Sequence, residues 1–209
     1  MIINSGGTYE ATAGTTEINS ETGSGIAFRV NSGGTFTHSN GLVNFTGPET
    51  WFYLISGSSG NFYDLEVASG NKLSCGSNMI MSNDFIISSG EYECAAITTV
   101  TGDTNITGTV DINSGYAFTT GSLTINSGGT YQATSGTTTI TSESSAGYSI
   151  YSKTGSTFTS NSGLVNVTYN GVSNIGIGDN ATKLHDLHIQ SSTKYFNGQS
   201  NSHVKLSGD

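Results

Sequence analysis

Positive charge, proline and cysteine are scarce in this sequence, and long hydrophobic runs are missing. Six Lys and Arg residues stand against 15 Asp and Glu residues, so the formal net charge is −9 at pH 7. Binding to nucleic acid or to anionic lipid needs a stripe of Lys and Arg, and the charge balance argues against both partners. No apolar run is long enough to insert in a membrane, and no basic and apolar leader follows Met1.

Strong helix formers are also sparse, and no segment shows a 3.6-residue hydrophobic period. The chain holds 29 Gly, and 33% of its residues are apolar, including 10 Tyr and 9 Phe. These apolar residues alternate with polar ones in short runs, as around Tyr9 and Ala11, which is the pattern of half-buried β-strands. The alternation gives each strand an apolar face that can be buried, and it therefore argues against a disordered chain.

An internal duplication dominates the chain. Residues 3–20, INSGGTYEATAGTTEINS, return as INSGGTYQATSGTTTITS at residues 125–142, a shift of 122 positions (125 − 3). Self-similarity at a fixed interval is the signature of an architecture built from stacked units. We therefore divide the chain into a first copy, 1–122, and a second, truncated copy, 123–209, which continue as one solenoid.

The repeated phrase Asn-Ser-Gly-Gly supplies corners between short strands. Gly adopts positive φ without a Cβ penalty, and Asn tolerates the left-handed region. Identical phrases at set intervals favour coils that stack in parallel, so that like residues form ladders along one axis. The sequence predicts an all-β, parallel β-solenoid, or β-helix, with about eight to ten coils of roughly 20–27 residues. An antiparallel sandwich is the alternative, and the handedness stays open.

The two cysteines, Cys75 and Cys94, are separated by a shift of 19 positions (94 − 75). Alternation puts each sulfur on the same face as its apolar neighbour two residues away, so both are expected to point inward. If one coil is close to that spacing, they stack on adjacent turns about 4.8 Å apart, within reach of a disulfide. Either two buried thiols or a disulfide fits the sequence, and a disulfide would favour an exported protein.

No catalytic constellation stands out. The motif His185-Asp186-Leu187-His188 resembles a metal site, but a strand would place the two His residues on opposite faces and leave fewer than the three or four ligands that a metal needs. The dispersed Lys and Arg residues provide no basic pair, and no paired carboxylates of a polysaccharide-processing β-helix are evident. We expect a non-enzyme with no cofactor, although incidental calcium at a corner stays open. The scattered acidic residues considered for it are Asp84, Asp103, Asp111 and Asp179.

Three consecutive aromatic residues, Trp51, Phe52 and Tyr53, lie in the least repetitive stretch. Exposed aromatics there would contact a ligand, as in a carbohydrate-binding module, whereas buried ones would plug the core under a longer loop, which is the favoured interpretation. Thr runs such as 137–139 suggest the flat ladders of an ice-binding solenoid, but the Thr-x-Thr pattern is interrupted, and Thr is also a good strand former.

Several phrases carry a resemblance to a known family: NFYDLEV at 61–67, LHDLHI at 184–189, and the repeated Ile-Asn-Ser-Gly-Gly-Thr-Tyr followed by Gly-Thr-Thr-Thr-Ile-type strands. They resemble the long repetitive β-strand regions of bacterial secreted or cell-surface adhesin-like proteins, over essentially the whole chain. The resemblance implies an extracellular or cell-surface location and a stalk or adhesive role, and it transfers no catalytic residues.

The expected function is a non-catalytic structural segment: a stalk, sheath or filament unit. The sequence starts and stops inside its own repeat rhythm, so we expect a piece of a longer protein. Exposed strand edges at the ends of a solenoid favour self-association, end to end or laterally. A carbohydrate-binding adhesive module that contacts cell-surface glycans is the alternative; a polysaccharide-processing enzyme and an ice-binding solenoid are weaker ones.

Overall fold

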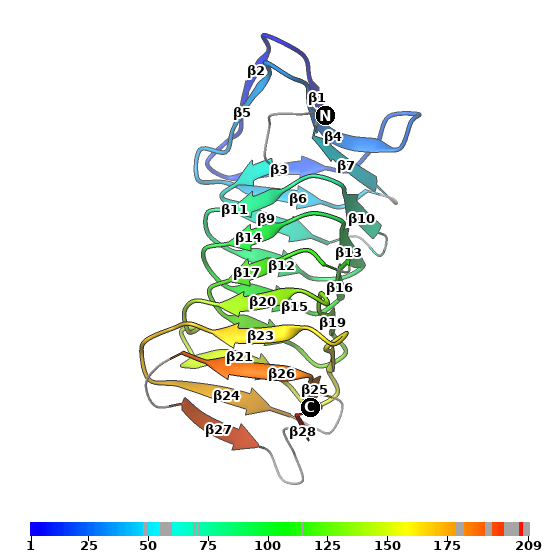
Figure 1. Cartoon of the computed structure of the whole chain (residues 1–209). Helices are drawn as coiled ribbons and strands as arrows, with labels where there is room; N and C mark the ends of the chain where they lie inside the picture. Colours follow the sequence, from blue (N-terminus) through cyan, green and yellow to red (C-terminus); the bar gives the residue numbers. More distant parts are fainter. Residues whose placement is uncertain are drawn as a thin grey trace.

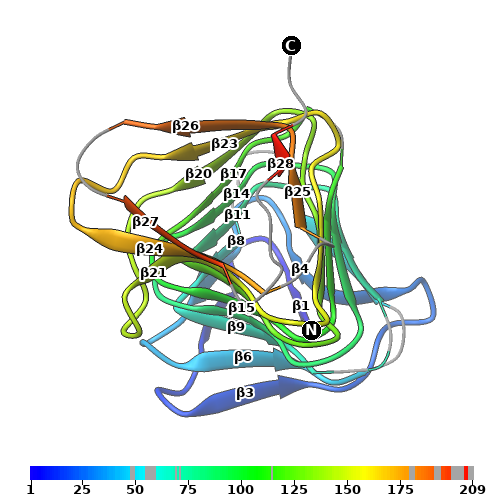
Figure 2. The same ribbon diagram turned by 90° about the horizontal axis from the view of Figure 1, so that it is seen from below.

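The chain folds into a parallel β-solenoid, so the predicted fold class is confirmed. The computed structural model describes residues 1–47, 50–54, 60–68, 70, 72–113, 115–178, 182–190, 194–198 and 205–206. Within these ranges every regular element is a β-strand, and every strand pairing is parallel. Strands pair with the third strand along the chain, so that three strands make one coil and each coil is roughly triangular in cross-section (Figure 2).

The three faces of the rod are built from parallel sheets (Figure 1). The ten-stranded sheet contains β1 (Ile2–Ile3), β4 (Ile26–Val30), β7 (Thr50–Leu54), β10 (Lys72–Cys75), β13 (Glu91–Cys94), β16 (Thr109–Ile112), β19 (Thr130–Gln132), β22 (Thr157–Thr159), β25 (Thr182–Leu184) and β28 (Lys205–Leu206). The nine-stranded sheet contains β3 (Thr15–Ile18), β6 (Leu42–Phe45), β9 (Asp64–Val67), β12 (Phe85–Ile87), β15 (Thr104–Ile106), β18 (Leu123–Ile125), β21 (Tyr148–Ser152), β24 (Ser173–Ile177) and β27 (Lys194–Gly198).

The third face is divided into two sheets. The seven-stranded sheet contains β8 (Gly60–Phe62), β11 (Met79–Met81), β14 (Thr98–Val100), β17 (Phe118–Thr120), β20 (Thr137–Ile140), β23 (Leu164–Val167) and β26 (Asp186–Ile189). The two-stranded sheet contains β2 (Thr8–Glu10) and β5 (Thr35–Thr37). Figure 1 shows this pair leaning away from the rod at its N-terminal end.

Coil length varies along the rod. In the first coil Ile3 pairs with Val30, a shift of 27 positions (30 − 3). In the middle Cys94 pairs with Ile112, a shift of only 18 positions (112 − 94). The middle coils are therefore shorter than the predicted range, because their corners are reduced to a few residues. At about 4.8 Å between neighbouring strands, the ten-stranded sheet extends on the order of 40 Å along the rod.

One hydrophobic core runs through all the coils. Inward positions alternate with outward ones, so that the typical strand has a buried, half-buried, buried pattern. The largest buried side chains of the core are aromatic, and the burial of each one stabilises the fold by about 1.5–3 kcal/mol. They include Phe28, Phe45, Phe62, Phe85, Tyr92, Phe118, Tyr131 and Phe158.

The duplicated sequence does not repeat after a whole number of coils. Ile3 lies in β1 of the ten-stranded sheet, whereas its equivalent, Ile125, lies in β18 of the nine-stranded sheet. The second copy is therefore turned by one face about the axis of the rod. Backbone conformation is nevertheless kept: φ is 75° at Gly6 and 83° at the equivalent Gly128. The same phrase thus turns the chain equally well at different corners.

Candidate functional site

The aromatic candidates Trp51, Phe52 and Tyr53 lie on β7, where the backbone of Phe52 pairs with that of Cys75. Their side chains lie outside the described residues, so no site is built on them.

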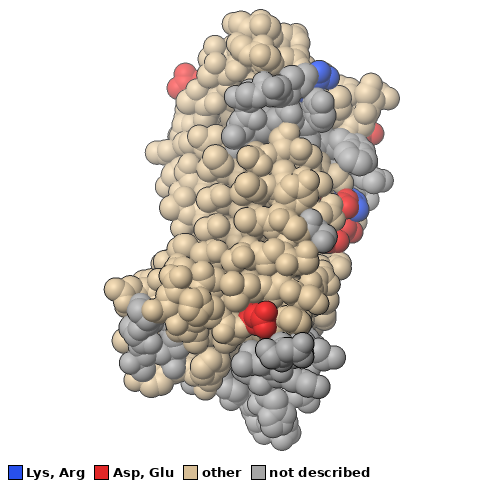
Figure 3. Space-filling model, viewed as in Figure 1, with Lys and Arg blue, Asp and Glu red and all other residues tan. Residues whose placement is uncertain are grey.

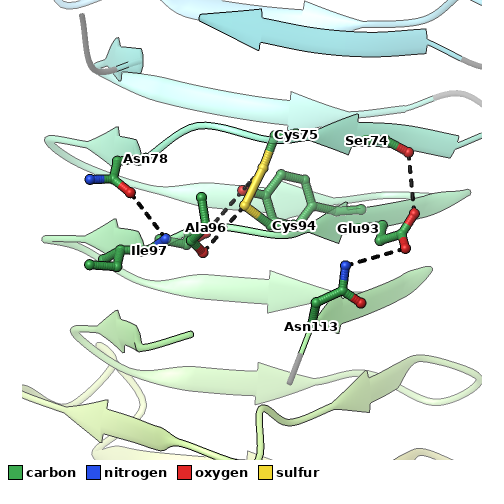
Figure 4. The surroundings of a disulfide bond; sticks show 10 residues. Ser74, Cys75, Asn78, Glu93, Cys94, Ala96, Ile97 and Asn113 are labelled. Carbon is green, nitrogen blue, oxygen red and sulfur yellow. Dashed lines mark hydrogen bonds between the residues drawn. A yellow bond between two sulfur atoms is a disulfide. The ribbon is translucent and has the colours of Figure 1, made fainter. Parts of the chain in front are cut away.

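Cys75 and Cys94 occupy directly paired positions at the ends of β10 and β13 and form a disulfide. Their Cα atoms are 4.8 Å apart, because one coil at this level of the rod is 19 residues long. Both residues are buried, and the bridge links one coil to the next through the core (Figure 4). The bridge therefore adds a covalent link along the axis of the rod.

The side chain of Tyr92 contacts this bridge. Its hydroxyl oxygen lies 3.3 Å from Cys75 Sγ and 3.1 Å from Thr98 Oγ1. Burial raises the pKa of Tyr92 far above its ordinary value, and the hydrogen bond to Thr98 opposes this only in part. Tyr92 therefore stays neutral at ordinary pH.

An ion-pair cluster lies on the outer surface of the ten-stranded sheet. Lys72 Nζ is 3.2 Å from Glu91 Oε1 and 2.5 Å from Glu93 Oε2. The hydrogen bond with Glu93 raises the pKa of Lys72, and the same bond lowers the pKa of Glu93. Glu93 also accepts hydrogen bonds from Ser74 and Asn113 on the neighbouring coils (Figure 4). With its oxygens occupied in this way, Glu93 is suited to hold neighbouring strands together.

Asp111 pairs with Glu93 across β13 and β16. The strand register brings together two acids that lie 18 positions apart in the sequence (111 − 93). Burial, followed by repulsion from Glu93 and Glu91, raises the pKa of the Asp111 carboxyl. Figure 3 shows few charged side chains on the face of the molecule that it displays.

A column of aspartates follows one corner of the rod. Asp64 accepts hydrogen bonds from the backbone N–H of Asp84 at 2.9 Å and from Asn83 at 2.8 Å, and Asp84 accepts one from the N–H of Asp103 at 2.8 Å. Ser122 in turn donates to Asp103 at 2.7 Å. Two of the acids regarded as scattered, Asp84 and Asp103, are thus neighbours, because their spacing matches one coil.

The carboxylates of this column satisfy backbone donors that a strand ladder leaves unpaired at a corner. Burial, the largest cause, and the charges of Asp103 and Asp64 raise the pKa of Asp84, whereas its hydrogen bond to the Asp103 N–H lowers it. Within the part of the chain that the structure describes, no group of three or more His, Cys, Asp or Glu residues is placed to hold a metal ion.

The motif around His185 does not converge on one site. Asp186 and His188 are both exposed on β26, on the outer side of the seven-stranded sheet. His185 lies before the strand, and its Nδ1 is 3.3 Å from Asp186 Oδ2. The two side chains form a single ion pair when His185 is protonated. A solvent-exposed ion pair of this kind stabilises a fold by no more than about 1 kcal/mol.

Outward Thr residues form only a short column on the seven-stranded sheet. Thr99, Thr119 and Thr139 are paired on three successive strands. Beyond them the same column continues with Asn166 and then His188. On this sheet the Thr column therefore covers three described strands before other residue types replace Thr.

A pair of tyrosines that the sequence did not single out lies on the outer surface of the nine-stranded sheet. The rings of Tyr148 and Tyr151 are stacked, with centroids 4.4 Å apart and planes 12° from parallel, and Lys153 Nζ lies 5.7 Å from the Tyr151 ring centroid. The rings lie over Gly176, where an added Cβ would come within 2.7 Å of both.

A β-bulge explains why these tyrosines share a face. Residues three apart on a regular strand point to opposite sides, but the register of β21 shifts between Tyr148 and Ile150, which turns both rings outward. The first copy has the same shift between Ile26 and Phe28. The sequence separation of two residues on a strand therefore does not tell whether they share a face when a bulge lies between them.

Comparison with known protein families, with characterised proteins and with solved structures finds no match to this chain. Among the residues described, no helix is long and apolar enough to cross a membrane.

Proposed function

We propose that this chain is a non-catalytic structural segment of an extracellular or cell-surface protein, serving as a stalk, sheath or filament unit. The observation that carries the proposal is the continuity of the core. Buried residues from Ile3 to Leu184 belong to one core cluster, and parallel strand pairings run along the ten-stranded and the nine-stranded sheets from one end to the other. Such an array resists bending and stretching along its whole length, which suits a spacer.

Two further observations support this role. The polar groups that a site would use are engaged in axial contacts: Glu93 with Lys72, and Asp84 with Asp103. The disulfide supports an oxidising location outside the cytosol, because glutathione and thioredoxin keep most cytosolic thiols reduced.

The location is tested on intact cells of the source organism. Antibody to the chain, added without permeabilising the cells, should label their surface, and external protease should remove that label. Alkylation of the native protein before reduction should leave Cys75 and Cys94 unmodified. Labelling only after permeabilisation, together with alkylated cysteines, would contradict the proposal.

Carbohydrate binding is the second candidate function, and the stacked pair Tyr148 and Tyr151 favours it. Flat aromatic surfaces beside a cation offer a sugar ring both apolar contact and a hydrogen-bond donor. A glycan array should then show binding that Tyr151→Ala abolishes and Tyr116→Ala, a change of another exposed tyrosine, leaves intact. Equal signals from both variants, or none from the unaltered protein, would remove this candidate.

A further inference from the structure

The bulge of β21 has a counterpart in β4 of the first copy. The register shifts between Tyr148 and Ile150 in one strand and between Ile26 and Phe28 in the other (148 − 26 = 150 − 28 = 122). Both strands are half-buried at their first and fourth residues and buried elsewhere. The two copies therefore share a backbone feature that directs two side chains of one strand to the outer surface.

The second copy places two phenols on this bulge. Its half-buried positions are Tyr148 and Tyr151, where the first copy has Ile26 and Arg29. The tyrosine rings are stacked, with centroids 4.4 Å apart and planes 12° from parallel. Rings stacked in this way are in contact, because the optimal separation of non-bonded carbon atoms is about 3.5–4 Å.

Gly176, on the next coil, provides the space for both rings. It pairs with Tyr151, and a Cβ at its position would come within 2.7 Å of Tyr148 Cε1, a carbon ortho to the hydroxyl, and of Tyr151 Cδ2. Gly176 is not among the glycines with positive φ, so its backbone conformation does not itself require glycine. The first copy has Leu54 at the equivalent position (176 − 54 = 122). The pair of phenols and the space beneath them thus occur together, in one copy.

We propose that Tyr148 and Tyr151 form an oxidative cross-linking site, at which a peroxide-dependent one-electron oxidant joins the two rings as dityrosine. The oxidant takes one electron and one proton from each phenol. The two phenoxyl radicals then couple through a carbon–carbon bond between their ortho carbons, and the hydrogen on each of these carbons moves to the oxygen of its own ring. The two electrons and two protons reduce one molecule of hydrogen peroxide to two of water, so the reaction balances.

Contact between the rings favours coupling within one chain. Two reacting groups that are held together react in a unimolecular step, which can be faster than a bimolecular encounter by many powers of ten. Exposure selects the same pair, because Tyr148 and Tyr151 are half-buried and open to an oxidant, whereas Tyr92 and Tyr131 are fully buried. Tyr9 is also stacked, but on Phe36, which has no phenol to oxidise.

The cross-link is permanent, since a reductant that opens the disulfide between Cys75 and Cys94 does not cleave a carbon–carbon bond. It ties the two ends of the bulge together on the outer surface of the nine-stranded sheet. Its formation in the organism rests on the extracellular location proposed above, because the cytosol is kept reducing.

Treatment of the full chain with hydrogen peroxide and a haem peroxidase tests the site. At micromolar protein the unaltered chain should gain dityrosine fluorescence while it remains a monomer on a denaturing gel, and its mass should fall by that of two hydrogen atoms. Peptide mapping should place the link between residues 148 and 151. Tyr148→Phe and Tyr151→Phe should each lower the yield of dityrosine in the monomer at least about tenfold, because each change removes one phenol and keeps the ring.

Two further variants separate geometry from composition. Gly176→Ala keeps both phenols but displaces the rings, so it should also lower the yield. Tyr116→Phe removes a tyrosine with 40% exposure in the corner between β16 and β17 and should leave the yield unchanged. Circular dichroism checks the fold of every variant. The changes of Tyr148 and Tyr151 to Phe keep the packing, so they test the site even where Gly176→Ala perturbs the fold.

Absence of dityrosine from the unaltered monomer would overturn the proposal, as would a full yield from either phenylalanine variant. Cross-linked dimers without a link inside the monomer, at a yield that rises with protein concentration, would show that the tyrosines couple only between chains. Antibody labelling of intact cells and the glycan array use no oxidant, so failure of the coupling leaves the proposed functions standing. Labelling only inside cells, in turn, leaves the result with the purified chain unchanged.

Discussion

Removing the Tyr131 hydroxyl should destabilise the protein, whereas the same change at Tyr9 should not. Tyr131→Phe breaks a buried hydrogen bond of 2.8 Å and leaves the Thr138 hydroxyl without that partner in the core. A buried polar group that loses its partner costs about 1–3 kcal/mol. Tyr9→Phe removes no such bond, because Thr16 Oγ1 has no partner, and should change the free energy of unfolding by less than about 0.5 kcal/mol.

Thermal and urea unfolding of monomeric protein measure both changes. For a chain of this size, a loss of 1–3 kcal/mol lowers Tm by roughly 2–12 °C. Adding Thr138→Val to Tyr131→Phe should recover part of the loss, since the orphaned hydroxyl is then gone, and a double-mutant cycle gives the coupling between the two groups. Equal effects of Phe at the two tyrosine positions would refute the reasoning, because it depends on one copy being covered and the other not.

Three further changes test the corners, the disulfide and the aspartate column. Gly163→Ala should destabilise the protein by about 2 kcal/mol or more, because the added Cβ would lie 2.1 Å from the Thr134 carbonyl oxygen, whereas Gly23→Ala meets nothing within 4 Å and should be neutral in the same urea titration. Replacing both cysteines by Ala should cost about 3 kcal/mol, the loop-closure value for a 19-residue separation, and a reductant should then have no further effect on the melting curve. Asp84→Asn should be slightly more stable than the unaltered chain at pH 7, since it keeps an acceptor for the Asp103 N–H and removes like-charge repulsion.

The effect of Asp84→Asn should depend on pH, because the pKa of the Asp84 carboxyl is raised in the folded chain. The folded state raises the pKa of Asp84 above its usual 3.8, so the folded chain binds more protons than the unfolded chain as pH rises from that value. Stability from this group is therefore present below 3.8 and is lost as pH rises through the folded pKa. The advantage of Asp84→Asn should vanish in acid, and an advantage that persists there would contradict the electrostatic cause.

The sequence predicted the fold class because the alternation of apolar and polar residues and the repetition of short phrases can both be read directly from the sequence. The spacing of Cys75 and Cys94 also anticipated their stacking, since their sequence separation of 19 is one coil at that level of the rod. The sequence did not reveal how many residues make one coil. The 122-position shift alone does not say how many strands lie between Ile3 and Ile125, so the sequence could not predict that these two residues lie on different faces of the rod.

The outer surface was harder to predict because it depends on register. Asp64, Asp84 and Asp103 follow one another at 20 and 19 residues (84 − 64, 103 − 84), close to one coil, and that regularity could have identified the column. The stacking of Tyr148 on Tyr151 could not have been found from alternation, because the bulge that turns both rings outward has no mark of its own in the sequence.

The central claim, that successive coils stack in parallel with like residues in register, is tested most directly by engineered cross-links. Thr99 and Thr119 are paired on adjacent strands, while Thr139 is one strand further. In a chain whose own cysteines are replaced by Ala, Thr99→Cys with Thr119→Cys should form a disulfide on mild oxidation. Thr99→Cys with Thr139→Cys should not, since two coils separate the sulfurs by about 9.6 Å between strands. Mass spectrometry without reduction reads both results, and bridging of the second pair but not of the first would contradict the stacked arrangement.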